Sequence, residues 1–296
     1  MAVTALLQAG LGNQLFIYGA ALGMARRLDA DLILDTSLFR FDTRRNYELG
    51  FFDSGATAVV GNYLDKKRKR QDASNLPAKF AQYLTIRKLA KNPKVLMEKS
   101  KSFDVRTQSW GDGTKLLGYF QSWRYLEGVK QELKKRILNA ANLDANAQSW
   151  ITDQKHQISK LKDPVLVHLR RGDYLLPAHR DFHGLLDDSY YRRALDVLSN
   201  NQELRSVYVI SDDVNLARDL FGFLPDVHYL VQPPELSDAA TLLVAAGFQR
   251  YVIANSSFSW WAAWLSDSNE VVAPKQWFAR ADLDSRDVCP PAWTLI

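Results

Sequence analysis

The first forty residues follow the hydrophobic pattern of a βαβ unit. Residues 3–7 and 31–35 are short, mainly apolar runs. Between them, a glycine-containing turn at residues 10–14 leads into helical spacing of apolar residues over 15–28. Short apolar runs on either side of a helix are typical of buried parallel strands. The pattern therefore predicts a strand, a helix and a second strand of the same parallel sheet.

The second half of the chain repeats this alternation of short apolar runs and helical patterns. Alternation of this kind indicates βαβ units with right-handed crossovers. The predicted strands lie at residues 165–169, 207–210, 227–231, 251–254 and 270–273, and the predicted helices at 188–199, 214–221, 236–246 and 259–265.

The middle of the chain is less regular and predicts only helices near residues 76–90 and 125–140. A polar stretch at residues 145–160 separates the two halves of the chain. We therefore predict an α/β protein with parallel sheets in two Rossmann-like domains that face each other. The first domain covers residues 1–155 and the second covers 156–296.

Ligands of open parallel sheets bind at the carboxyl ends of the strands. The residues that directly follow the predicted strands are therefore the first candidates for a binding site. Four such groups are polar or rich in glycine, and we expect them to line one crevice. They lie at residues 10–14, 170–174, 211–213 and 255–258.

Composition narrows the class of protein. The chain is 47% hydrophobic and 24% charged, which predicts a folded globular protein rather than a disordered one. Its single cysteine, Cys289, excludes an internal disulfide and favours the reducing cytoplasm. No apolar run is long enough for a transmembrane helix.

The net charge of +5 owes much to the basic run at residues 66–70. A run of this kind is usually a solvated surface segment. It could also bind anionic lipid, and would then give peripheral contact with the inner face of a membrane. Because no aromatic residues alternate with it, we do not expect a nucleic-acid partner.

Two arginines at the end of the strand at residues 165–169 give the strongest chemical signal. The planar guanidinium group of arginine matches phosphate oxygens. Successive side chains of a strand point to opposite faces, so Arg170 shares a face with His168. Arg171 points to the other face, where it either joins the phosphate site or pairs with a carboxylate.

A second signal is the sequence Asn255-Ser256-Ser257-Phe258, which leaves a strand and starts a helix. The serines can cap the helix, and the first backbone N–H groups of a helix form an anion site. Such a site would hold a phosphate without a metal. Trp260 and its neighbours on this helix are either core residues or platforms for a sugar.

The turn with Gly10 and Gly12 permits a close approach to a ligand, and the adjacent Asn13 and Gln14 could donate hydrogen bonds to sugar hydroxyls. No Gly-Lys-Ser/Thr follows, so the turn is not a P-loop.

Ser211 and Asp212 follow another predicted strand and favour a ribose contact or a structural role over a metal. The next residue, Asp213, could simply cap the helix that follows.

Together these motifs resemble those of the inverting α-1,2-fucosyltransferases of bacterial type. The resemblance rests on the segments 10–16, 118–122, 168–174 and 255–265, and it extends over nearly the whole chain. It implies a GT-B-like fold, GDP-fucose as the donor and no divalent metal or other cofactor.

The resemblance also implies roles for single residues. Arg170 would contact the β-phosphate and stabilise the departing GDP, with His168 beside the nucleotide. Ser256, Ser257 and the backbone of Phe258 would hold phosphate oxygens. Asn255, Arg171, Ser211 and Asp212 complete the expected donor site.

The sequence departs from the family pattern at one position. Related enzymes carry an acid that reads guanine about fourteen residues before the equivalent of Asn255, where this chain has Thr241. The nearest acid is Asp238, one helical turn earlier. Either Asp238 takes this role or guanine is read differently.

We therefore expect inverting transfer of L-fucose from GDP-β-L-fucose to O2 of a terminal galactose, on an oligosaccharide or a lipid-linked glycan. Asp173 is a catalytic candidate, although the general base is unassigned. Asn13, Gln14, Gln121 and Trp260 are the expected acceptor residues. Two alternatives stay open: a fucosyltransferase of α-1,6 or protein O-linked type, and a non-catalytic protein that binds anionic surfaces through residues 66–70.

Overall fold

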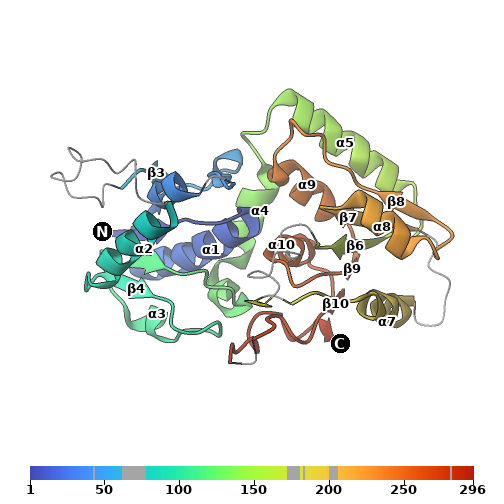
Figure 1. Cartoon of the computed structure of the whole chain (residues 1–296). Helices are drawn as coiled ribbons and strands as arrows, with labels where there is room; N and C mark the ends of the chain where they lie inside the picture. Colours follow the sequence, from blue (N-terminus) through green and yellow to red (C-terminus); the bar gives the residue numbers. More distant parts are fainter. Residues whose placement is uncertain (43, 62–77, 172–180, 183, 200–205, 281) are drawn as a thin grey trace. The chain divides into compact units, whose positions relative to one another are not determined.

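The computed structural model describes residues 1–42, 44–61, 78–171, 181–182, 184–199, 206–280 and 282–296 (Figure 1). The chain divides into two compact units, Met1–Ala141 and Asn142–Ile296. The predicted boundary after residue 155 falls inside helix α5 (Ala145–Ser159), which packs against helix α9 (Asp238–Ala245) and so belongs to the second unit.

The first unit contains a five-stranded parallel sheet with the strand order β3-β2-β1-β5-β4. Its first strands confirm the predicted βαβ unit, with Val3 of β1 opposite Leu32 of β2. The strands are β1 (Ala2–Leu6), β2 (Asp31–Asp35), β3 (Thr57–Val59), β4 (Val95–Met97) and β5 (Lys115–Leu117). The helices are α1 (Leu11–Leu28), α2 (Ala78–Ala90), α3 (Arg106–Ser109) and α4 (Lys130–Asn139), with short 3-10 helices η1 (Ser37–Phe41), η2 (Leu49–Phe51), η5 (Trp123–Tyr125) and η6 (Glu127–Val129).

Helix α1 is the core helix of the first unit and is buried on most of its surface. A helix that is apolar nearly all round is expected in this position. In the turn before α1, the residue with a left-handed backbone is Ala9, whose φ is 63°. Gly10 has an extended backbone with a φ of −76°. The predicted turn at residues 10–14 is therefore wrong for residues 11–14, which form the first turn of α1, and the left-handed residue lies one position before Gly10.

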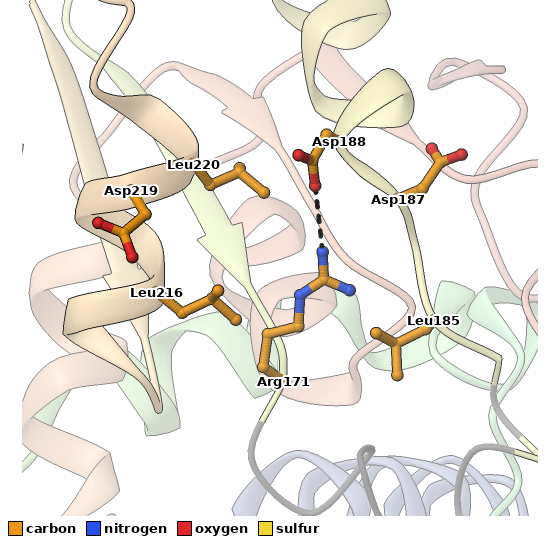
Figure 2. A pocket seen from close by; sticks show the side chains of 7 residues that line it. All are labelled: Arg171, Leu185, Asp187, Asp188, Leu216, Asp219 and Leu220. Carbon is orange, nitrogen blue, oxygen red and sulfur yellow. Dashed lines mark ion pairs between the residues drawn. The ribbon is translucent and has the colours of Figure 1, made fainter.

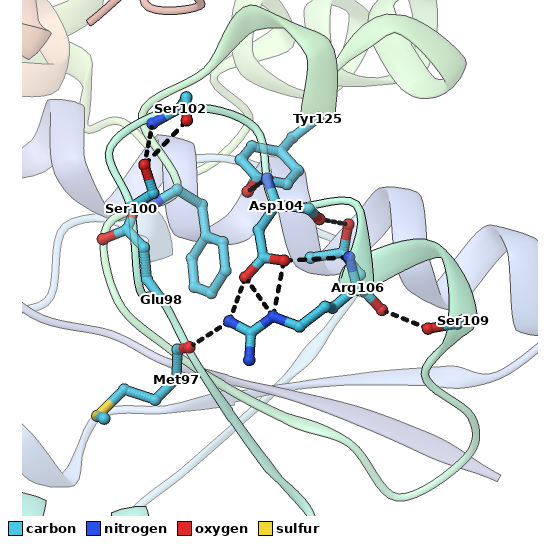
Figure 3. Close-up of polar contacts among 10 residues, drawn as sticks. Met97, Glu98, Ser100, Ser102, Asp104, Arg106, Ser109 and Tyr125 are labelled. Atoms are coloured by element: carbon cyan, nitrogen blue, oxygen red, sulfur yellow. Dashed lines mark hydrogen bonds and ion pairs between the residues drawn. The ribbon is translucent and has the colours of Figure 1, made fainter. Parts of the chain in front are cut away.

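A network of polar contacts fixes the loop that follows β5. Both carboxylate oxygens of Glu98 accept backbone N–H groups from this loop, at 3.1 Å from Tyr119 and 2.8 Å from Phe120. Close by, the Asp104 carboxylate binds the Arg106 guanidinium group, and the backbone N–H of Asp104 donates to the Tyr125 hydroxyl at 2.6 Å (Figure 3). These contacts fix the backbone that carries Gln121.

The second unit contains a six-stranded parallel sheet with the strand order β11-β10-β9-β6-β7-β8. All the strands and helices predicted for this half of the chain are present. The strands are β6 (Val165–Leu169), β7 (Val207–Ser211), β8 (Val227–Tyr229), β9 (Arg250–Val252), β10 (Glu270–Ala273) and β11 (Thr294–Leu295). The remaining helices are α7 (Asp188–Ser199), α8 (Val214–Phe221) and α10 (Ser257–Leu265).

The central strand β6 presents two different faces. Val165, Val167 and Leu169 pack into a core cluster with residues of α7 and α8. On the other face, the ring of His168 lies against Phe258 at the start of α10, with the ring centroids 5.8 Å apart. The alternation of a strand thus sends odd and even residues of β6 to different helices.

The tryptophans of α10 form part of the core of the second unit. Trp260 is 0% exposed and donates its indole N–H to the carbonyl oxygen of Val288 at 2.9 Å. Its ring also contacts Trp261, Trp264 and Trp293. The predicted acceptor contact of Trp260 is therefore wrong for this structure, because its indole ring is fully enclosed by the protein.

Within the described residues, no helix has both the length and the apolar character needed to cross a membrane.

Candidate active site

The carboxylate of Asp212 joins the carboxyl ends of β6 and β7. Its Oδ2 lies 2.9 Å from Nη1 of Arg170, and its Oδ1 accepts the backbone N–H of Arg171 at 2.9 Å. One carboxylate therefore restrains both the Arg170 guanidinium group and the backbone of the next residue. A charged hydrogen bond of fixed geometry orients a guanidinium group. Asp212 therefore fixes the Arg170 side chain at the carboxyl end of the sheet.

His168 lies on the same face of β6 as Arg170 and is almost completely buried, with 6% of its surface exposed. Burial, together with the nearby charge of Arg170, lowers the pKa of His168 to about 3, although Asp212 acts in the opposite direction. The imidazole is therefore neutral at physiological pH. Its Nδ1 has no hydrogen-bond partner among the described residues, which leaves a polar atom for a ligand.

Helix α10 begins beside His168 and offers unpaired backbone donors. Its N-cap, Ser256, has an extended backbone and makes no side-chain cap bond. The first helical hydrogen bond runs from the N–H of Trp260 to the oxygen of Ser256 at 3.0 Å. In the described part of the chain, the N–H groups of Ser257, Phe258 and Ser259 thus have no backbone acceptor. Such donors, reinforced by the helix dipole, favour an anion.

The side chain of Arg171 lies on the other face of β6. Only 7% of it is exposed, and its Nη2 lies 3.7 Å from Oδ1 of Asp188 at the start of α7. Figure 2 shows the guanidinium group pointing toward Asp188 in a pocket of about 450 Å³, which is lined by Arg171, Leu185, Asp187, Asp188, Leu216, Asp219 and Leu220. The alternative that Arg171 pairs with a carboxylate is confirmed, and its side chain does not join the face of His168.

The residues around Asp212 have structural roles. The hydroxyl of Ser211 donates to the carbonyl oxygen of Asp213 at 2.9 Å, and Asp213 caps α8 by accepting the N–H of Leu216 at 3.0 Å. The predicted capping role of Asp213 is confirmed. No group of three or more potential metal ligands is present among the described residues.

The remaining residues considered for the donor are Asn255 and the two positions considered for guanine, Asp238 and Thr241. Asn255 is buried, and its Nδ2 donates to the carbonyl oxygen of Trp277 at 3.3 Å, so it holds the chain before α10. Asp238 is half-buried in the first turn of α9. Thr241 is buried and donates to Oε1 of Gln232 at 2.6 Å. Of the two positions considered for guanine, only Asp238 carries an acid, and its role stays a prediction.

In the first unit, the structure brings two predicted acceptor residues together. Nε2 of Gln121 donates to Oδ1 of Asn13 at 2.5 Å, and Asn13 is half-buried. Since Asn13 accepts at its Oδ1, its amide N–H groups remain available as donors.

Gln14 has a different role from the one predicted. Its side chain is fully buried, its Nε2 donates to the carbonyl oxygens of Ala9 and Asn46, and its Oε1 accepts the N–H of Glu48. All its polar atoms are used to fix the turn, so the predicted sugar contact of Gln14 is wrong for this structure. Its amide instead holds the turn that precedes Asn13.

Two predictions lie outside the described residues: the catalytic candidate Asp173 and the basic run at 66–70. Conversely, sequence reasoning missed Glu98, which holds the loop of Gln121. Its only sequence signal is an acid directly after a short apolar run.

The sequence matches glycosyl transferase family 11 over residues 2–296, and the chain belongs to this family. It is 28% identical to the O-antigen biosynthesis glycosyltransferase WbnK of Escherichia coli, over 92% of this chain and 94% of that protein. It is 27% identical to the alpha-1,2-colitosyltransferase of E. coli, over 99% and 98% of the two chains.

A more distant relative is the galactoside 2-alpha-L-fucosyltransferase SEC1 of Bos taurus, with 26% identity over 54% of this chain and 44% of that protein. Among solved structures, the NodZ alpha-1,6-fucosyltransferase crystallised with GDP is similar, with a TM-score of 0.50 and 15% identity over 88% and 91% of the chains. This likeness confirms the GT-B-like α/β fold, and family membership confirms that the chain is a glycosyltransferase.

The depressed pKa of His168 predicts a specific pH dependence of stability. As the pH falls from 7 to 5, His168 takes up a proton in the unfolded chain, where its pKa is about 6.5, but not in the folded protein. The free energy of unfolding should therefore fall by about 2 kcal/mol from this group alone. Urea unfolding of wild type and His168→Gln at both pH values measures the difference. Equal pH dependence in the two proteins would contradict the assignment.

Proposed function

We propose that this glycosyltransferase transfers L-fucose from GDP-β-L-fucose to O2 of a terminal galactose, with inversion at the fucose C1. The observation that carries the proposal is the pairing of an oriented arginine with a helix N-terminus. Asp212 holds Arg170 on the same face of β6 as His168, and His168 contacts the first turn of α10. Cationic and N–H donors therefore converge where the diphosphate of a nucleotide sugar would bind.

In the proposed reaction, the acceptor oxygen forms a bond to C1 of fucose while the bond from C1 to the β-phosphate oxygen breaks. GDP leaves with the bonding electrons, and the acceptor hydroxyl loses its proton to a base or to water. Arg170 and the N–H groups of Ser257 and Phe258 stabilise the charge that develops on GDP. Neutral His168 places its unpaired Nδ1 beside the nucleotide. Asp173 remains a catalytic candidate, and the general base is unassigned.

We propose that these groups take the place of a divalent metal. In metal-dependent transfer, a cation offsets the negative charge of the leaving diphosphate. Here the guanidinium group and the helix dipole can act on the same charge. The one aspartate that follows β7 on this side is already engaged with Arg170. Its carboxylate therefore supports the arginine and is not left over as a metal ligand.

Transfer of colitose is a second candidate. One relative, similar over 99% of this chain, is an alpha-1,2-colitosyltransferase. Donor competition distinguishes the two candidates: if nucleotide-activated colitose is used in preference to GDP-fucose at equal concentration, the fucose assignment is wrong. Both candidates share the linkage to O2 of the acceptor.

The acceptor we propose is a galactose-ended oligosaccharide or lipid-linked glycan, with transfer in the cytoplasm. The similarity to an O-antigen biosynthesis glycosyltransferase supports a bacterial surface glycan. In the first unit, Asn13 and Gln121 form a hydrogen-bonded pair next to the turn before α1. Amide pairs of this kind can bind sugar hydroxyls as donors and acceptors.

The donor mechanism predicts that Arg170→Ala lowers kcat by about 100- to 1,000-fold, because one charged donor to the leaving group is lost. GDP release from GDP-fucose with a panel of β-galactosides, in excess EDTA, measures this. Wild type should turn over in EDTA, and the exposed control variant Arg286→Ala should match it. Loss of wild-type turnover in EDTA that Mg²⁺ or Mn²⁺ restores would contradict the metal-free mechanism.

The acceptor proposal predicts that Asn13→Ala raises the KM for the galactoside about tenfold and leaves the affinity for GDP unchanged. The variant removes an amide that can bind a sugar hydroxyl, and one such bond contributes about 1 kcal/mol, more when its loss leaves Gln121 unpaired. Initial rates across galactoside concentrations measure KM, and calorimetry measures GDP binding. An unchanged KM and kcat would show that Asn13 does not serve the acceptor.

A further inference from the structure

The outer face of helix α2 carries large apolar side chains that the fold leaves exposed. Phe80 and Tyr83 are 47% and 53% exposed, and their rings stack with centroids 6.4 Å apart. Arg87 continues the same face, with its guanidinium carbon 5.6 Å from the Tyr83 ring centroid. The spacing of i, i+3 and i+7 places all three side chains in one stripe along the helix.

The opposite face of α2 is fully used by the core of the first unit. Leu89 belongs to a buried cluster with Leu38 of η1 and Val95 of β4, and Ile86 packs against this cluster. The helix is therefore held in place without the help of its outer stripe. The aromatic pair is thus not needed to bury the helix.

The charged residues of α2 and of the segment that follows it, up to residue 97, are all cationic. Residues 73–97 contain five lysines and arginines and no aspartate or glutamate. The exposed cations that follow the aromatic pair include Arg87, Lys88, Lys91 and Lys94. Among the described elements that pack against α2, η1 adds Arg40, and neither η1 nor β4 contains an acid. An exposed aromatic pair beside exposed cations thus forms an amphipathic, cationic surface.

We propose that this surface, defined by Phe80, Tyr83, Arg87 and Lys91, docks the protein on an anionic phospholipid bilayer. Aromatic side chains settle at the level of the lipid headgroups, and cations close to the surface are attracted to anionic lipid. A single-stranded nucleic acid would need separate aromatic faces for successive bases. Here the two rings stack on each other, so a lipid surface fits the arrangement better.

Such docking goes beyond the transfer reaction and does not depend on it. A peripheral enzyme held at a bilayer would meet lipid-linked acceptors at high local concentration. The reaction with a soluble acceptor needs no bilayer, so binding and catalysis can be tested separately.

Flotation with phosphatidylglycerol–phosphatidylethanolamine vesicles tests the proposal on the full chain. Wild type should bind these vesicles and not pure phosphatidylcholine vesicles. Arg87→Glu/Lys91→Glu should weaken binding at least about 25-fold, since each cation near the surface contributes at least about a factor of five. Phe80→Ser/Tyr83→Ser should weaken it at high as well as low salt, because its contribution is apolar.

The matched control is Lys160→Glu/Lys162→Glu, which makes the same change of charge at exposed positions after α5. It should bind vesicles as wild type does, and all variants should turn over a soluble acceptor at the wild-type rate. Three results would overturn the proposal: no wild-type binding to anionic vesicles, equal losses in the control and the α2 variants, or wild-type binding in both α2 variants. The last would assign the binding to the basic run at 66–70. If wild type binds no vesicle but does bind a single-stranded oligonucleotide, the first of these results would also assign the surface to a nucleic acid.

Discussion

The candidate site depends on one carboxylate that two neighbouring strands share. Asp212 at the end of β7 accepts both the guanidinium group of Arg170 and the backbone N–H of Arg171 at the end of β6. Two parallel strands bring the groups together, and the ion pair with Asp212 then limits the directions that the Arg170 side chain can take. Without this contact, Arg170 would be a long side chain at the carboxyl end of β6, with several rotamers of similar energy. The Asp212 carboxylate therefore orders the cationic side of the candidate anion site.

Because successive side chains of β6 point to opposite faces, the two adjacent arginines have different partners. Arg170 shares a face with the neutral, buried His168, which contacts the first turn of α10. Arg171 instead enters the side of the sheet covered by α7 and α8, where it lies 3.7 Å from Asp188. Arg170 thus lies on the face proposed for the ligand, while Arg171 connects the strand end to a helix. An identical residue type at consecutive positions has two functions because the side chains of a strand alternate.

Much of this could be predicted from the sequence, because strand alternation and βαβ spacing are local properties. The local pattern correctly placed the strands of the second unit and the opposite directions of Arg170 and Arg171. It could not reveal the partner of Arg171's backbone, since Asp212 lies 41 positions away. Gln14 was misread for the same reason: its Nε2 bonds to Asn46, 32 positions away. Trp260 was ambiguous because a fully apolar helix gives no outward face.

The central claim is that Asp212 orients Arg170 for the diphosphate of the donor, and calorimetry of GDP binding tests it most directly. Asp212→Asn keeps an oxygen for the N–H of Arg171 but removes the charge that holds Arg170. We expect GDP affinity to fall about tenfold, as for the loss of one charged hydrogen bond. Asp213→Asn changes the neighbouring acid to another good N-cap and should bind GDP as wild type does. Equal GDP affinity in wild type and Asp212→Asn, or an equal loss in both variants, would contradict the claim.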